Sequence, residues 1–214
     1  MKRKYIIFDL DDTLMYEIEY LQSAYREISE FVDKINGYEL YDDMIKWYIE
    51  KQDVFGILEK KYSHSKIQLL EIYRNHFPNI EIAKDVKKVL GYIRENSFKL
   101  GLISDGRSVT QRNKLKALNI EGLFDRIVIS EEFGSTKPNF KNYEIFMNDH
   151  ESFDFFYIGD NTTKDFIAPN NLGWTTIAIR DSGRNIHKQD FECSQEHKPQ
   201  FIVDNIKEII DYIG

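Results

Sequence analysis

The sequence predicts an α/β protein: a Rossmann-like parallel sheet flanked by helices, with a small all-helical segment inserted after the first strand. Short apolar runs alternate with helical patterns over most of the 214 residues, which is typical of a parallel sheet covered on both faces. One stretch near the N-terminus shows helical spacing alone. Polar and charged residues gather directly after the apolar runs, where open α/β sheets hold their ligands.

Six apolar runs are expected to form strands, because each is short and bounded by polar residues or turn signals. These runs are 5–8, 99–103, 126–129, 154–158, 175–179 and 201–203. Helices are expected between the later strands. Ser108 has capping-box spacing with Gln111 and is expected to begin one helix, and Asp204 is expected to cap the last one.

Residues 15–81 break this alternation and contain no strand pattern. Apolar residues recur at helical spacing over 18–35 and again over 44–58. Ser65 has capping-box spacing with Gln68 before a third helical stretch. A purely helical block of this size favours a small subdomain of its own.

This insert divides the expected architecture into two units. Residues 1–14 and 82–214 are expected to form the Rossmann-like core, and residues 15–81 are expected to form a helical cap. Because the insert is attached beside the carboxyl end of the first strand, it is positioned to cover whatever binds there.

Composition limits the kinds of partner. The chain carries 36 acidic side chains against 29 lysines and arginines, so no basic excess exists to neutralise a nucleic acid or an anionic membrane. No apolar run reaches membrane-spanning length. The single cysteine, Cys193, excludes an internal disulfide and fits a reducing cytosol. We expect a cytoplasmic protein acting on a small molecule, with no nucleic-acid or membrane partner; the sequence does not indicate its oligomeric state.

Several features carry no site in this interpretation. The five histidines are scattered and are expected at the surface: His64, His76, His150, His187 and His197. Cys193 lies four residues before the last of them, but no second pair supports a zinc site. The polar stretch 180–199 is expected to be a loop or a partly disordered segment.

The most informative segment directly follows the first apolar run. It reads Asp9-Leu10-Asp11-Asp12-Thr13. The body of a buried parallel strand excludes charge, so carboxylates at its end lie where ligands bind. An acidic cluster without a nearby cation also favours a divalent metal ion.

A hydroxyl and a tight turn follow the second expected strand. Ser104 comes first, and Asp105 and Gly106 follow. Glycine lets the backbone turn sharply, so that its N–H groups can point at an anion. Taken alone, Ser104 fits a turn or helix cap equally well.

One cation and two more acids complete the set. Lys137 follows a Gly-Ser-Thr stretch and precedes Pro138, which predicts a loop position. Asp160 comes after the apolar run 154–158, and Asp165 stands five residues later. Because the carboxyl ends of parallel strands share one edge, all these groups are expected to converge. Taken alone, Lys137 fits a solvated surface and Asp165 fits the start of the next helix.

In this order, the motifs resemble the haloacid dehalogenase superfamily of Mg-dependent phosphohydrolases over nearly the whole chain. Residues 9–13 match the family's first motif, Ser104 the second and Lys137 the third. Asp160 with Asp165 matches the fourth. The helical insert resembles the family's type-one cap.

The resemblance implies a phosphatase that works through an aspartyl-phosphate intermediate. Asp9 would attack phosphorus, and Asp11 would protonate the leaving oxygen and then activate water. Mg²⁺ would be held by Asp9, by the backbone carbonyl of Asp11 and by Asp160.

Phosphate binding is implied for Ser104, Asp105, Gly106 and Lys137. Behind them the resemblance places Asp165 and Thr13. Two roles stay open for Asp165, which are a water-mediated contact to the metal and the orientation of Lys137.

The function expected from these residues is Mg²⁺-dependent hydrolysis of a small phosphomonoester, with a sugar phosphate or a nucleotide as the substrate class. The acid at Asp11 argues against dehalogenation, since a halide needs no proton to leave. Two alternatives stay open. One is a phosphomutase or phosphotransferase that uses the same Asp9, and the other is a protein that binds phosphate esters without turnover.

Overall fold

The computed structural model describes residues 3–148 and 152–214. Within them, six strands form one sheet in the order β3-β2-β1-β4-β5-β6, and every pairing is parallel. The strands are β1 (Arg3–Phe8), β2 (Lys99–Ser104), β3 (Arg126–Ile129), β4 (Phe153–Gly159), β5 (Thr175–Ile179) and β6 (Phe201–Val203). All six predicted strands are present, so the predicted α/β class is confirmed.

The first strand lies at the centre of this sheet, between β2 and β4. Ile6, Ile7 and Phe8 have no exposed surface, as a central strand covered on both faces requires. Successive side chains point to opposite faces of a strand. Ile6 and Phe8 accordingly join one hydrophobic cluster, and Tyr5 and Ile7 join the other.

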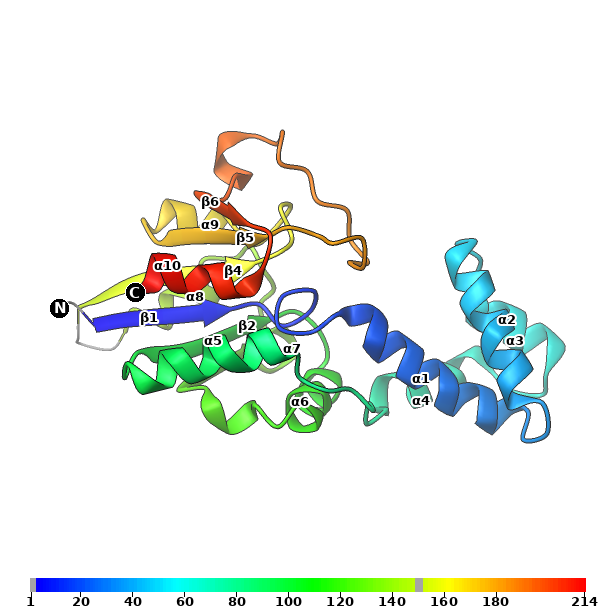
Figure 1. Cartoon of the computed structure of the whole chain (residues 1–214). Coiled ribbons are helices and arrows are strands. Elements are labelled where there is room, and N and C mark those ends of the chain that lie inside the picture. Colours follow the sequence, from blue (N-terminus) through cyan, green and yellow to red (C-terminus); the bar gives the residue numbers. More distant parts are fainter. Residues whose placement is uncertain (1–2, 149–151) are drawn as a thin grey trace.

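Helices cover both faces of the sheet (Figure 1). The cluster around Ile6 also holds apolar residues of α5, α6, η3 and α10, and the cluster around Ile7 holds residues of α8 and α9. The helical elements outside the insert are α5 (Lys84–Glu95), α6 (Ser108–Ala117), η1 (Glu121–Leu123), α7 (Ser130–Phe133), α8 (Lys141–Glu144), α9 (Ile167–Asn171), η2 (Gln195–His197), η3 (Ile206–Ile209) and α10 (Ile210–Ile213).

Two of the predicted caps are wrong. Helix α6 has Arg107 at its N-cap, and the Ser108 hydroxyl donates to Glu132 at 2.6 Å instead. At the last helical element the cap is Asn205, whose side chain accepts the N–H of Lys207. Asp204 pairs with an arginine instead. In both places a tertiary partner captures the side chain that local spacing assigned to the cap.

Between β1 and α5 the chain forms four helices, which project away from the sheet in Figure 1. They are α1 (Glu17–Val32), α2 (Gly37–Ile49), α3 (Val54–Lys61) and α4 (Lys66–Asn75). Ser65 caps α4 by accepting the N–H of Gln68, as its spacing predicted. The stretch 44–58 is not one helix, because Lys51 has a φ of 58° and Asp53 caps a new helix.

The four helices pack around their own cluster of buried residues, which includes Leu21, Ile28, Met44, Leu58 and Leu69. The residues of this cluster all belong to the insert, whereas Tyr20 and Ala24 of α1 join the cluster around Ile6 on the sheet. No described helix of the protein is long and apolar enough to cross a membrane.

A polar seam joins this helical segment to α6. Thr110 and Asn113 donate to backbone carbonyls at the end of α4, those of Arg74, Asn75 and His76. His76 is buried, against the expectation that all histidines are at the surface. Its ring contacts Glu27 and lies 2.7 Å from the Ser23 hydroxyl, both on α1. His150 lies outside the described residues.

Candidate active site

The carboxyl ends of β1, β2 and β4 bring the predicted site residues to one edge of the sheet. Asp9 follows β1, Ser104 ends β2, and Asp160 follows β4. Lys137 reaches the same place from the loop after α7. Its ammonium group lies 2.7 Å from the carboxylates of both Asp9 and Asp165. Residues far apart in the sequence therefore meet at the edge that the carboxyl ends of the parallel strands share.

This edge holds a buried excess of negative charge. The carboxylates of Asp9, Asp160 and Asp165 each offer an oxygen within 4.8 Å of the others. Lys137, whose side chain is fully buried, contacts two of them. Burial tends to lower the pKa of Lys137, but Asp165 and Asp9 outweigh this effect and hold its pKa above the usual value. The lysine is thus a permanent cation.

Burial has the opposite effect on the acids, because it raises the pKa of a carboxyl group. Burial is the largest cause that raises the pKa of Asp9, to about 7, although the charge of Lys137 opposes it. Burial and the neighbouring Asp165 and Asp9 raise the pKa of Asp160 to about 9. In the absence of a further cation, one lysine does not compensate the charges of these carboxylates.

This donor set fits a magnesium ion. Hard cations such as Mg²⁺ take oxygen ligands, and carboxylates provide them together with the charge that a divalent ion neutralises. Asp160 is oriented by the Asn185 side chain, which donates to its Oδ2 at 3.1 Å. Of the expected ligands, Asp9 and Asp160 belong to the cluster. The carboxylate of Asp11 points elsewhere.

Asp165 is fully buried behind this cluster. Its Oδ2 accepts the backbone N–H groups of Asp160 and Asn161, and its Oδ1 pairs with Lys137. A Cβ at Gly159 would lie 2.5 Å from Asp165 Oδ2, so only glycine allows this close approach. Of the two roles left open for Asp165, these contacts favour the orientation of Lys137.

Asp11 faces helix α6. Lys114 lies 2.7 Å from its Oδ1, and Gln111 donates to its Oδ2 at 2.8 Å. Gln111 also contacts the Ser104 hydroxyl at 2.5 Å. Lys114 is stacked over the ring of Tyr20 on α1, 4.7 Å from the ring centre. Side chains of α6 therefore contact both Asp11 and Ser104.

Two of the three remaining predicted residues, Asp105 and Gly106, have structural partners of their own. Asp105 accepts the N–H of Lys137 at 3.0 Å and pairs with Lys164 at 3.1 Å. Gly106 has a φ of 143°, and its N–H donates to the Ser130 hydroxyl at 2.9 Å. Thr13 is buried, and its hydroxyl has no hydrogen-bond partner among the described residues.

Asp9, Asp11, Asp105 and Asp160 line a cavity of about 170 Å³, whereas Ser104, Gly106, Lys137 and Asp165 lie outside its lining. Its lining consists of Asp9, Asp11, Asp12, Glu17, Asp105, Asp160, Asn161, Lys164 and His187. Glu17, Asn161, Lys164 and His187 were not predicted from the sequence. His187 belongs to the long loop between β5 and β6, whose polar composition gave no sign of this position.

Asp12 joins three parts of the protein at the rim of the cavity. It has a φ of 55°. Its Oδ1 accepts the N–H of Glu17, which begins α1, and its Oδ2 accepts the N–H of Ile186, on the loop after β5. The helical segment and this loop are thus both tied to the turn that follows β1.

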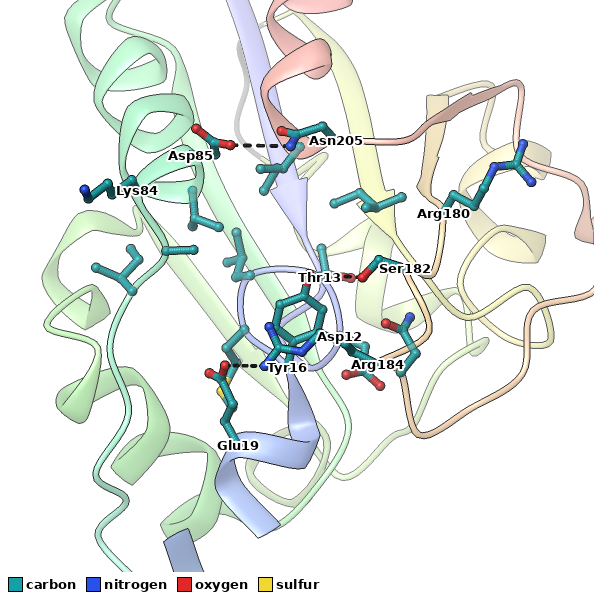
Figure 2. Close-up of a pocket in the computed structure, with 18 of the residues that line it drawn as sticks. Asp12, Thr13, Tyr16, Glu19, Lys84, Asp85, Arg180, Ser182, Arg184 and Asn205 are labelled. Atoms are coloured by element: carbon teal, nitrogen blue, oxygen red, sulfur yellow. Dashed lines mark hydrogen bonds and ion pairs between the residues drawn. The ribbon is translucent and has the colours of Figure 1, made fainter. Parts of the chain in front are cut away.

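A second, larger cavity of about 400 Å³ lies beside residues 12–16 and is lined by both connections to the helical segment (Figure 2). The guanidinium carbon of Arg184 lies 3.8 Å from the centre of the Tyr16 ring, and its Nη2 lies 2.7 Å from Oε1 of Glu19. Asp12 lines both cavities, but Asp9 and Asp160 belong to the lining of the smaller one alone. The clustered acids therefore mark the smaller cavity as the candidate active site.

Comparison with known families agrees with this fold. Residues 6–179 match the family described as haloacid dehalogenase-like hydrolase. This match covers most of the chain, so the protein belongs to that family and is an enzyme. The resemblance predicted from the four motifs is confirmed.

Curated relatives extend over nearly the whole chain. The protein named glyceraldehyde 3-phosphate phosphatase of Methanocaldococcus jannaschii is 28% identical, over 98% of this chain and 96% of its own. The protein of the same name from Methanopyrus kandleri is 29% identical, over 98% and 97%. A phosphoglycolate phosphatase of Aquifex aeolicus is 26% identical over 63% and 64%.

Solved structures share the fold at lower identity. The putative HAD-hydrolase YfnB from Bacillus subtilis, described as bound to magnesium, matches with a TM-score of 0.70 and 16% identity over 100% of both chains. A predicted phosphoglycolate phosphatase from Haemophilus somnus matches with a TM-score of 0.68 and 18% identity, over 100% and 99%. At such identities the likeness extends to the fold alone.

Proposed function

We propose that the protein is a Mg²⁺-dependent phosphatase that hydrolyses a small phosphomonoester, a sugar phosphate or a nucleotide, through an aspartyl-phosphate intermediate. One observation carries the proposal. The Asp9 carboxylate is held 2.7 Å from Lys137 at the sheet edge, and Asp11, two residues on, lines the same cavity. The phosphatase names of the relatives support the same reaction class.

Asp9 is the nucleophile of this proposal. Lys137 fixes one carboxylate oxygen and, with its own positive charge, reduces the repulsion between Asp9 and an anionic phosphate. Asp165 keeps the lysine in place from behind. When bound, Mg²⁺ would supply the further positive charge that the transition state of phosphoryl transfer requires. Asp9, Asp160 and the backbone carbonyl of Asp11 would hold it.

Asp11 is the acid and base. It would give a proton to the leaving oxygen and then take one from the water that attacks the intermediate. Gln111 and Lys114 set the position of its carboxylate. Ser104, tied to the same glutamine, would donate its hydroxyl to a phosphoryl oxygen, and the backbone around Asp105 and Gly106 would complete the phosphate site.

The helical segment would act as a cap, residues 15–81, on a catalytic core of residues 1–14 and 82–214. Its own hydrophobic core allows it to move as a unit relative to the sheet. Closure over the cavity would exclude bulk water while the phosphoryl group is transferred. The hydrogen bonds between α4 and α6 would change in that motion.

The test is phosphate release from a panel of sugar phosphates, nucleotides and other small esters, with Mg²⁺ and with a chelator. We expect metal-dependent release by the wild type and a loss of at least about 10³-fold in Asp9→Asn, which keeps the side-chain volume but removes the nucleophile. Asp211→Asn makes the same chemical change on an exposed residue of α10 and should retain activity.

Near-normal turnover by Asp9→Asn would contradict the mechanism. Product analysis separates the alternatives within the same experiment. A phosphomutase would return an isomeric ester and little free phosphate. A binding protein would hold an ester tightly and release nothing.

A further inference from the structure

Glu17 is the single residue of the helical segment that lines the small cavity among the described residues. It is the first residue of α1, and its backbone N–H donates to Asp12 at 2.9 Å. This hydrogen bond fixes the beginning of the helix at the cavity rim. The Glu17 side chain is thus the contribution of α1 to the lining of this cavity.

The carboxylate of Glu17 differs from every other carboxylate of the lining. Asp9 and Asp11 each pair with a lysine, and Asp105 pairs with Lys164. Asp12 and Asp160 accept hydrogen bonds from N–H groups. For the Glu17 carboxylate, no hydrogen bond or ion pair is found within the described parts of the chain. Among the carboxylates of this lining, it is the one whose oxygens have no such partner in the described residues and stay available to a ligand.

The charges around Glu17 oppose a second anionic group on the substrate. Burial and the nearby Asp11 raise the pKa of Glu17 to about 7, which places the group among other acids. The lysines close to the cavity are already engaged, Lys137 with Asp9, Lys114 with Asp11 and Lys164 with Asp105, and the remaining basic side chain of the lining is the exposed His187. A carboxylate or second phosphate on the leaving group would find repulsion from Glu17 and no lysine free to bind it.

We propose that Glu17 is a specificity-determining residue, which selects esters whose leaving group is neutral and hydroxylated and disfavours esters whose leaving group carries an anion. A hydroxyl of a polyol or sugar can donate to the Glu17 carboxylate, whereas an anion offers no donor and is repelled. This inference depends on the proposed phosphatase function, because it concerns the group that leaves from the same cavity.

Two esters with one carbon skeleton test it. Glycerol 3-phosphate has a neutral leaving group, and 3-phosphoglycerate has a carboxylate at the corresponding end. We expect the wild type at pH 8 with Mg²⁺ to prefer glycerol 3-phosphate in kcat/KM by at least about tenfold, as repulsion between charges in a partly buried site implies. Glu17→Gln should reduce this ratio by about tenfold, mainly through a higher kcat/KM for 3-phosphoglycerate.

Glu30→Gln is the matched control, because it removes the same charge from an exposed position of the same helix. It should leave the ratio unchanged. An equal ratio in Glu17→Gln and the wild type, or a wild type that prefers 3-phosphoglycerate, would overturn the inference while the phosphatase function stands. If neither ester releases phosphate, the dissociation constants of both esters, measured by calorimetry on the same three proteins, decide the inference by the same ratio.

Discussion

Among the lysine–aspartate pairs at the candidate site, those of Lys137 and Lys114 have different surroundings. Lys137 pairs with Asp9 in a fully buried environment that also holds Asp165. Lys114 pairs with Asp11 at the cavity rim, where the Asp11 side chain remains 19% exposed. The first pair belongs to a cluster with an excess of negative charge. The second is balanced, one lysine for one carboxylate, and is completed by the neutral Gln111.

This difference assigns two roles: Lys137 compensates buried charge, and Lys114 positions a carboxylate. A buried carboxylate that loses its cation has no water to replace it, so Lys137 should matter for both stability and catalysis. Asp11 keeps access to water, so Lys114 should matter mainly for where the carboxylate points. The following predictions test this distinction.

The largest effect is expected for Lys137→Met. The change leaves Asp9 and Asp165 buried without a cation, and we expect a loss of about 3–5 kcal/mol in the free energy of unfolding. Activity with Mg²⁺ should fall by at least about 10³-fold. Urea denaturation and phosphate release measure the two effects. Lys141→Met, at an exposed position on α8, is the control and should change neither.

A smaller effect is expected for Lys114→Met. Water and Gln111 can still solvate Asp11, so the free energy of unfolding should fall by less than about 2 kcal/mol. The carboxylate loses its fixed position, and kcat should fall about 10- to 100-fold with little change in KM. Lys116→Met, exposed on the same helix, serves as the control. A stability loss equal to that of Lys137→Met would remove the distinction between the two pairs.

The last prediction concerns the pH dependence of stability in the metal-free protein. The folded state raises the pKa of Asp9 to about 7 and of Asp160 to about 9, against an ordinary value of 3.8. The folded protein then binds protons that the unfolded chain has released, so stability falls as pH rises from about 4 through these values.

Thermal unfolding with a chelator should therefore show a midpoint several degrees lower at pH 8 than at pH 5.5. Mg²⁺ should raise the midpoint more at pH 8, where the acids are ionised and able to bind it. A stabilisation by Mg²⁺ that is equal at both pH values would argue against these acids as its ligands.

The sequence predicted the sheet well, because the signal for a buried parallel strand is local. The runs 126–129, 175–179 and 201–203 have the bounds of β3, β5 and β6 as predicted. The motif residues also met at one edge, since strand order and direction impose it. Helix boundaries were less well predicted, as Lys51 and Asp53 show, where one expected helix becomes two.

The parts of the site that could not be predicted depend on contacts across the chain. Gln111 and Lys114 lie 100 and 103 positions from Asp11, and nothing in the local pattern of α6 indicates that partner. Asn185 and His187 belong to a loop whose composition predicts only that it is polar. Glu17 fits an ordinary first-turn acid of a helix, and only the fold shows that its carboxylate lines a cavity and has no partner in the described part of the chain.

The central claim is that Asp9 receives the phosphoryl group, and the direct measurement is a rapid acid quench during turnover, followed by peptide mapping with mass spectrometry. The substrate is the best ester found in the panel, with Mg²⁺ present. We predict a phosphorylated peptide that contains Asp9, and its absence from Asp9→Asn. Turnover without any phosphorylated peptide, or phosphate on another residue, would contradict the account.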